Sequence, residues 1–143
     1  MEERASLLPV FVYGTLKRGC PLHAAISGCQ FSGTYRTANR YPMLIAGPRY
    51  APMMLDQPGV GHRIIGELYV VDSLALSKID GLESIGTPGN LRISIDIEPF
   101  AGGAKRKAWA YLKGPDLAEP AHSDYLAYYQ DDGRFIAPSR ARR

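Results

Sequence analysis

The fold is organised around the segment Val10-Phe11-Val12-Tyr13-Gly14-Thr15-Leu16-Lys17-Arg18-Gly19. Its run of β-branched and aromatic residues ends at Gly14, which predicts a buried strand over Pro9–Tyr13. A glycine at the end of a strand lets the next backbone N–H groups face something other than a neighbouring strand. We therefore expect the loop Tyr13–Leu16 to be the floor of a site that holds a carboxylate or a phosphate. The loop lacks both glycine-rich phosphate-binding motifs, and a plain β-turn is the alternative interpretation.

Further short strands are predicted along the chain, each bounded by glycine, proline or polar residues. The clearest is Leu91–Glu98, in which apolar and polar residues alternate. The turn Ala101–Ala104 follows, so this strand and the next should pair as a hairpin. Gly66 indicates a bulge or a close approach of two backbones in the middle of its strand. The predicted strands are Gln30–Tyr35, Tyr41–Ala46, Ala51–Leu55, His62–Val71, Leu91–Glu98 and Lys105–Leu112.

One helix is predicted over Ser73–Leu82, with Asp72 as its N-cap. Pro21–Ile26 suits a shorter helix because proline favours the first helical position, and His122–Gln130 suits either a short helix or ordered coil. Many short strands with few helices favour a closed or nearly closed sheet with helices on its flank. We expect a single domain over residues 1–143, with loose ends at 1–8 and 137–143.

Composition narrows the class of protein. The 143 residues are 45% apolar and 22% charged, which is ordinary for a globular protein with one core. No apolar run approaches the roughly 20 residues of a membrane span, and the first residues lack a signal-peptide pattern. The net charge of +3 owes much to Arg140, Arg142 and Arg143, and so short a basic tail does not indicate nucleic-acid binding. We expect a cytoplasmic monomer that binds neither nucleic acid nor membrane.

The sequence offers no metal site. His23, His62 and His122 are far apart, and the two cysteines lack C-x-x-C spacing. Two cysteines are also too few for a disulfide framework, so both thiols should be reduced. Cys20 follows Lys17 and Arg18 closely, which could lower the pKa of its thiol; a half-buried, inert thiol is the alternative.

Glu83 is the acid that could carry chemistry. It follows the last turn of the predicted helix and precedes the loop at residues 84–90. Burial there would raise its pKa toward neutrality and let it take and return a proton, whereas a solvated helix end would leave it inert. Asp80, one turn earlier, should face solvent, and Glu67 is a second candidate for an acid that points inward.

These segments together resemble the γ-glutamylcyclotransferase-like (AIG2-like) family, and most of all its γ-glutamylamine cyclotransferase branch. The opening segment 10–19 is similar to the family's first motif, and Ile79-Asp80-Gly81-Leu82-Glu83 is similar to the segment that bears its catalytic glutamate. The similarity also includes residues 41–47 and 58–72. The order and spacing of these motifs, over most of residues 9–98, make the match specific.

The resemblance implies an α+β fold, a small mixed β-barrel with short flanking helices. It also implies an enzyme that releases 5-oxoproline from γ-glutamyl amines such as γ-glutamyl-ε-lysine, without a metal or cofactor. Glu83 would be the acid/base. The backbone N–H groups of Tyr13, Gly14, Thr15 and Leu16 would bind the small-molecule substrate.

One departure from the family leaves alternatives open. Many relatives carry a tyrosine two residues before an arginine after the catalytic glutamate, and here Asn90 precedes Arg92. The protein could therefore act on γ-glutamyl amino acids or another amine conjugate, or be a weak or inactive member that binds a small molecule. Tyr125, Tyr128 or Tyr129 could fill the missing tyrosine's place.

Overall fold

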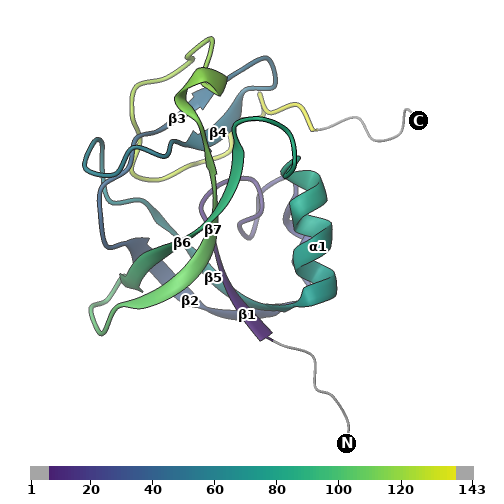
Figure 1. The fold of residues 1–143 in the computed structure, drawn as a ribbon, viewed down its shortest axis with the longest axis vertical. Coiled ribbons are helices and arrows are strands. Elements are labelled where there is room, and N and C mark those ends of the chain that lie inside the picture. Colours follow the sequence, from purple (N-terminus) through teal and green to yellow (C-terminus); the bar gives the residue numbers. More distant parts are fainter. Residues whose placement is uncertain (1–6, 138–143) are drawn as a thin grey trace, which may run out of the picture.

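The computed structural model describes residues 7–137, and its centre is a closed barrel of five strands (Figure 1). Four neighbouring pairs are antiparallel, and β7 closes the barrel beside β1 in a parallel pair. This arrangement confirms the expected small mixed β-barrel of the α+β class. In order around the barrel, the strands are β1 (Leu7–Val12), β5 (Ile65–Asp72), β2 (Gln30–Thr37), β6 (Asn90–Pro99) and β7 (Arg106–Lys113).

The remaining elements lie on the barrel's flank and at one end. The helix α1 (Ser73–Leu82) lies along the side of the barrel, and β3 (Met43–Ala46) pairs with β4 (Ala51–Met54) in a separate two-stranded sheet (Figure 1). Two 3-10 turns complete the set, at His23–Ala25 and Pro115–Leu117.

The second half of β1, residues 10–12, is buried on both faces, which explains its unbroken apolar sequence. Phe11 belongs to the core inside the barrel, whereas Val10 and Val12 belong to a second core that includes Ile79 of α1. Strand β6 has one buried face, so Ile95 and Ile97 alternate with polar residues. The first strand is thus held between the barrel interior and the helix that carries Glu83.

Several predicted boundaries were wrong. Leu7 and Leu8 pair with β5, so they are not part of a loose end; residues 1–6 and 138–143 lie outside the described residues. The strand predicted from His62 begins at Ile65. The helix expected over Pro21–Ile26 is only one 3-10 turn. Of the two alternatives for His122–Gln130, a short helix or ordered coil, the structure has coil.

Other local predictions are confirmed. The helix begins and ends where the sequence placed it, and the predicted hairpin is β6–β7. At Gly66 the close approach is real, because a Cβ atom there would overlap the carbonyl oxygen of Val12 and lie 2.8 Å from the Phe11 ring. Glycine at this position lets β1 and β5 pair above a large aromatic side chain.

Candidate active site

The C-terminal end of α1 sets the position of Glu83. Ser84 has a left-handed backbone, with φ of +56°. Its N–H donates to the Gly81 carbonyl at 3.2 Å, and the Ile85 N–H donates to the Asp80 carbonyl at 3.0 Å. These two bonds are those of a Schellman motif, which reverses the chain immediately after the helix. Glu83 is the last residue before that reversal, so the turn fixes its backbone.

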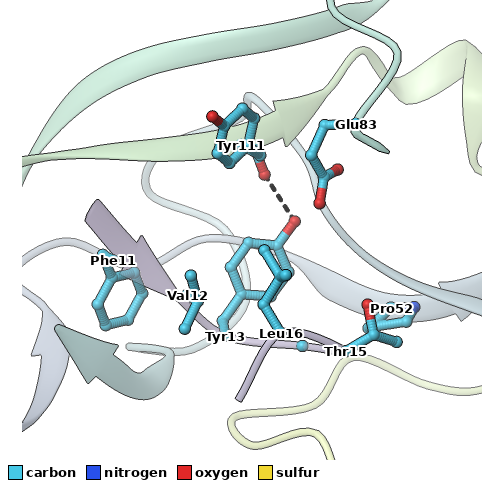
Figure 2. Close-up of a pocket in the computed structure, with 9 residues that line it drawn as sticks. Phe11, Val12, Tyr13, Thr15, Leu16, Pro52, Glu83 and Tyr111 are labelled. Carbon is cyan, nitrogen blue, oxygen red and sulfur yellow. Dashed lines mark hydrogen bonds between the residues drawn. The ribbon is translucent and has the colours of Figure 1, made fainter. Parts of the chain in front are cut away.

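Glu83 lines a pocket with the loop that follows β1. The pocket has about 300 Å³ of space between atoms, part of which is open to solvent, and Tyr111 and Pro52 contribute to its walls. In Figure 2 the Glu83 carboxylate points toward the hydroxyl end of Tyr13. The structure therefore brings together the residues that the sequence analysis singled out, Glu83 and residues 13–16. Their catalytic and binding roles stay predictions.

Two effects act on the charge of Glu83. Burial raises the pKa of the carboxyl group above its ordinary value, because it disfavours the charged form. Lys113 opposes this shift, since its Nζ lies 3.4 Å from Glu83 Oε1. The side chain of Glu83 keeps 22% of its surface exposed, so solvent or a ligand can reach it. A carboxyl group with a raised pKa and an open side is suited to proton transfer.

The loop after β1 uses its carbonyl groups and leaves amide donors unused. The carbonyl of Gly14 accepts from the Lys17 N–H at 3.1 Å, and that of Thr15 from the Leu22 N–H at 2.9 Å. By contrast, the N–H groups of Gly14, Thr15 and Leu16 donate to no backbone oxygen within residues 7–137. Buried backbone donors nearly always have a partner. The wall of this pocket therefore has donors to offer a ligand.

Gly14 is required here by space rather than by an unusual backbone angle. A Cβ atom on Gly14 would lie 2.6 Å from Cγ of Pro52, which is closer than side-chain carbons approach. Pro52 belongs to β4, so the small sheet packs directly on the loop. Glycine at this position therefore allows the loop and β4 to lie in close contact at the wall of the pocket.

The Tyr13 hydroxyl is committed to the fold. It donates to the Tyr111 carbonyl at 2.6 Å and accepts from the Met54 N–H at 3.3 Å (Figure 2 shows the first bond). Burial, assisted by the negative charge of Glu83, raises the pKa of the phenol far above its ordinary value. Tyr13 is therefore a neutral part of the pocket floor across the physiological pH range.

Sequence reasoning missed Lys113, and it considered Asn90 only as the residue that stands where many relatives carry a tyrosine. Lys113 Nζ donates to Asn90 Oδ1 at 2.7 Å, and Asn90 Nδ2 donates to Thr87 Oγ1 at 2.8 Å. Asn90 and Lys113 stand opposite each other in the β6–β7 hairpin, so the exact register of the hairpin was the signal needed to pair them. Asn90 thus orients the lysine that contacts Glu83. Of the residues the structure describes, none of the tyrosines proposed to replace the missing one lines the pocket.

Asp80 does not face solvent as predicted. It accepts a hydrogen bond from the Tyr111 hydroxyl at 2.6 Å, and its Oδ1 lies 3.0 Å from Arg92 Nε. Arg92 also stacks over the Trp109 ring, at 4.7 Å from the ring centroid. The hairpin strands cover this side of α1, so Asp80 ties the helix to the barrel behind the site.

The remaining candidates lie apart from the pocket. Glu67 accepts from the Arg18 N–H at 2.9 Å and from the Tyr69 hydroxyl at 3.0 Å, and it does not line the pocket. Burial raises the pKa of the Cys20 thiol and outweighs Lys17, and the thiol is half-buried, so the structure agrees with the second of the two alternatives for Cys20. Lys17 Nζ instead donates to the Tyr129 carbonyl at 2.6 Å and stacks on Tyr128.

Residues 7–137 contain no group of three or more His, Cys, Asp or Glu side chains arranged to hold a metal ion. No helix in this part of the chain is long and apolar enough to cross a membrane.

The fold and geometry thus define a small mixed barrel with a pocket that is lined by a carboxyl group, Glu83, and by a loop whose N–H groups have no backbone partner among residues 7–137. Residues 10–131 match the family described as "Gamma-glutamyl cyclotransferase, AIG2-like", and the chain belongs to this enzyme family.

Individual relatives agree with this membership. The chain is 35% identical over 139 residues to a protein of Bos taurus named gamma-glutamylaminecyclotransferase, an alignment that covers 93% of this chain and 82% of that protein. It is 44% identical over 80 residues to the Homo sapiens protein of the same name, about half of each chain (52% and 52%). A crystal structure of an AIG2-like protein from Mus musculus superposes with a TM-score of 0.79 at 28% identity, over 96% of this chain and 99% of that one.

Proposed function

We propose that this protein is a γ-glutamylamine cyclotransferase that converts a γ-glutamyl amine into 5-oxoproline and a free amine. The observation that carries the proposal is the pocket shared by Glu83 and the unused N–H donors of the loop after β1. The names of the Bos taurus and Homo sapiens relatives favour an amine conjugate over a γ-glutamyl amino acid. We propose that it acts in the cytoplasm as a monomer and needs no cofactor.

The reaction is an internal acyl transfer. The substrate's α-amine attacks its own γ-carbonyl carbon, a five-membered lactam closes, and the bond from that carbon to the leaving nitrogen breaks. Because the nucleophile is tethered to the carbonyl, much of the advantage of proximity lies within the substrate. What the protein must supply is the curled conformation of the substrate and the movement of protons.

Glu83 supplies the proton transfers in this proposal. The α-ammonium, with a pKa of roughly 8, carries three protons and keeps one of them on the lactam nitrogen. Glu83 takes one of the others, which frees the lone pair for attack, and returns it to the leaving nitrogen. The third proton leaves the ring nitrogen to solvent, and the departing neutral amine takes up a proton from solvent to become an ammonium ion, so one ammonium is present before and after the reaction. Lys113 beside Glu83 favours the ionised carboxylate in which the cycle begins.

The loop donors supply binding and charge stabilisation. The N–H groups of Gly14, Thr15 and Leu16 would hold the substrate's α-carboxylate or the oxyanion that develops on the γ-carbonyl. Losing a single donor to an oxyanion costs roughly 3 kcal/mol of transition-state stabilisation in other enzymes. The predicted roles of residues 13–16 therefore fall on the backbone, with the Tyr13 side chain acting only as floor.

A direct assay tests the proposal. The purified protein is incubated with γ-glutamyl-ε-lysine and, separately, with γ-glutamyl-alanine, and 5-oxoproline is measured beside an active control enzyme. We expect 5-oxoproline from the first substrate and little from the second. Faster turnover of γ-glutamyl-alanine would move the protein to the amino-acid reaction. Binding of either compound without product would make it an inactive member of the family.

A further inference from the structure

A second, larger cleft adjoins the pocket and has the character of a leaving-group subsite. We call it the outer cleft; it holds about 940 Å³ of empty space and is open to solvent. It shares Thr15, Pro52 and Glu83 with the pocket. If Glu83 returns a proton to the leaving nitrogen, that nitrogen lies at this shared boundary. The rest of the leaving amine must then extend into the outer cleft.

Resting on the proposed function, we propose that the outer cleft selects amines whose apolar stem ends in a carboxylate. For the lysine conjugate this means that the carboxylate of the leaving lysine is recognised and its α-ammonium is not.

The walls of the outer cleft suit an apolar stem. Apolar side chains enter it from five separate parts of the chain. One of these is the C-terminal segment, residues 131–137, which is hydrogen-bonded to Arg49 just before β4. A methylene chain that extends from the leaving nitrogen would be in contact with these side chains instead of water. The apolar side chains are Leu22, Met53, Leu82, Leu117 and Phe135.

The charged residues of the outer cleft favour a carboxylate over an ammonium at the far end of the apolar stem. Within the described part of the chain, its ionisable lining residues are Arg49, Glu83 and Lys113. Glu83 and Lys113 are already paired with each other. A second ammonium on the leaving amine would therefore find no free carboxylate in the cleft, and it would lie near the positive charge of Arg49.

Arg49 is held in place and has donors left to offer. Its Nη1 donates to the Ala137 carbonyl at 2.8 Å, and its own carbonyl accepts from the Ile136 N–H at 2.9 Å. A guanidinium has five N–H donors in a fixed fork that matches a carboxylate. The C-terminal segment thus fixes Arg49 at the cleft while leaving most of its donors available to a substrate carboxylate.

Four γ-glutamyl conjugates test this selectivity. They carry lysine through its ε-amine, 6-aminohexanoate (lysine without its ammonium), 1,5-diaminopentane (lysine without its carboxylate) and pentylamine (lysine without either). We expect kcat/KM for the 6-aminohexanoate conjugate to equal or exceed that for lysine. It should exceed that for pentylamine about tenfold, the low end of what a hydrogen bond to a charged group contributes, and the diamine conjugate should be the poorest.

The variant Arg49→Gln should remove the tenfold advantage of 6-aminohexanoate over pentylamine, because the described lining of the cleft then has no guanidinium to bind the carboxylate. Arg134→Gln is the matched control, because Arg134 lies in the same C-terminal segment, pairs with Asp132 and does not line the cleft. Equal rates for all conjugates, or the best rate with the diamine, would overturn the selectivity alone. If no conjugate yields 5-oxoproline, the proposed function itself fails and the selectivity with it.

Discussion

The two ends of α1 differ in how well their residues suit the local backbone: the N-terminal end has a favourable cap, and the C-terminal end has a serine in a left-handed conformation. At the N-terminal end, Asp72 has an extended backbone and accepts a hydrogen bond from the Ala75 N–H at 2.8 Å. This is a common N-cap, and such caps contribute about 1 kcal/mol to stability. It lies on the surface and touches neither the pocket nor the outer cleft.

The C-terminal end carries a residue that is unfavourable for stability. Its Schellman turn needs a left-handed backbone, which glycine adopts freely, yet the position is occupied by Ser84. A left-handed conformation costs an L-amino acid roughly 1–2 kcal/mol. Glu83, the residue just before it, is a half-buried carboxyl group with a raised pKa.

The difference indicates where the chain departs from the arrangement that would be most stable. Strained backbone and buried charge tend to occur at functional sites, where the surrounding structure holds them in place. Here the surrounding structure is a chain of bonds after the helix: Asn90 donates to Thr87, and the Thr87 hydroxyl donates to the Ser84 carbonyl at 2.5 Å. Hydrogen bonds among its own residues thereby hold the loop at residues 84–90, directly after Glu83, in one conformation.

Changing a carboxylate to an amide at each end gives the largest contrast. Glu83→Gln should lower kcat by roughly 10²–10⁴-fold, the usual contribution of acid–base catalysis, because an amide cannot accept and return the proton. Asp72→Asn should leave kcat unchanged, since asparagine also caps helices well. Steady-state 5-oxoproline release measures both. A Glu83→Gln variant with the parent's rate would remove Glu83 from the mechanism.

The same variant should also change how stability depends on pH. A carboxyl group whose pKa is raised by folding binds its proton more tightly in the folded state. Its stabilising contribution is complete below the unfolded pKa and is lost as pH rises through the folded pKa. The parent protein should therefore lose stability relative to Glu83→Gln over that window, as urea unfolding at a series of pH values would show. A constant difference would mean that the pKa of Glu83 is not raised.

Lys113→Met should move the acid limb of the pH–rate profile to higher pH. Lys113 is the group that opposes the rise in the Glu83 pKa, so its loss leaves burial unopposed. Less of the carboxylate form would then be present at a given acidic pH, and kcat/KM would fall there. Lys113→Arg keeps the charge and should keep the limb near its original position. If Lys113→Met lowers the rate equally at every pH, the lysine acts on substrate instead of on Glu83.

Local signals in the sequence were sufficient for the helix and most strands. Asp72 and the apolar spacing after it placed α1 at its observed bounds, because capping and periodicity involve residues close in sequence. The many short strands favoured a closed or nearly closed sheet, and the family resemblance implied the small mixed barrel. The parallel β7–β1 pair that closes the barrel joins segments about 100 residues apart. No local pattern specifies that pair.

The sequence identified only those site residues that belong to short motifs of neighbouring residues. Glu83 and the loop at 13–16 could be singled out from motifs, whereas Lys113 reaches Glu83 only through the register of the β6–β7 hairpin. The same hairpin covers Asp80, which a surface-helix pattern placed in solvent. Ser84 gave no signal at all, since serine is not a residue that marks left-handed turns. Side chains that meet through tertiary packing were thus beyond the sequence analysis.

The smallest expected effect concerns the strained turn itself. Ser84→Gly should raise stability by about 1 kcal/mol, because glycine adopts the left-handed backbone at little steric cost. For a domain of this size that corresponds to a shift in Tm of roughly 3–5 °C. Thermal unfolding of the variant beside the parent protein measures it.

Ser84→Ala separates backbone strain from the loss of the hydroxyl group. Alanine keeps a Cβ atom and therefore keeps the strain, so this variant should gain no stability. An equal gain in both variants would show that the serine side chain, rather than its φ of +56°, is the unfavourable feature. A gain confined to glycine would show that the turn after Glu83 carries a cost that Asp72, at the other end of the helix, does not.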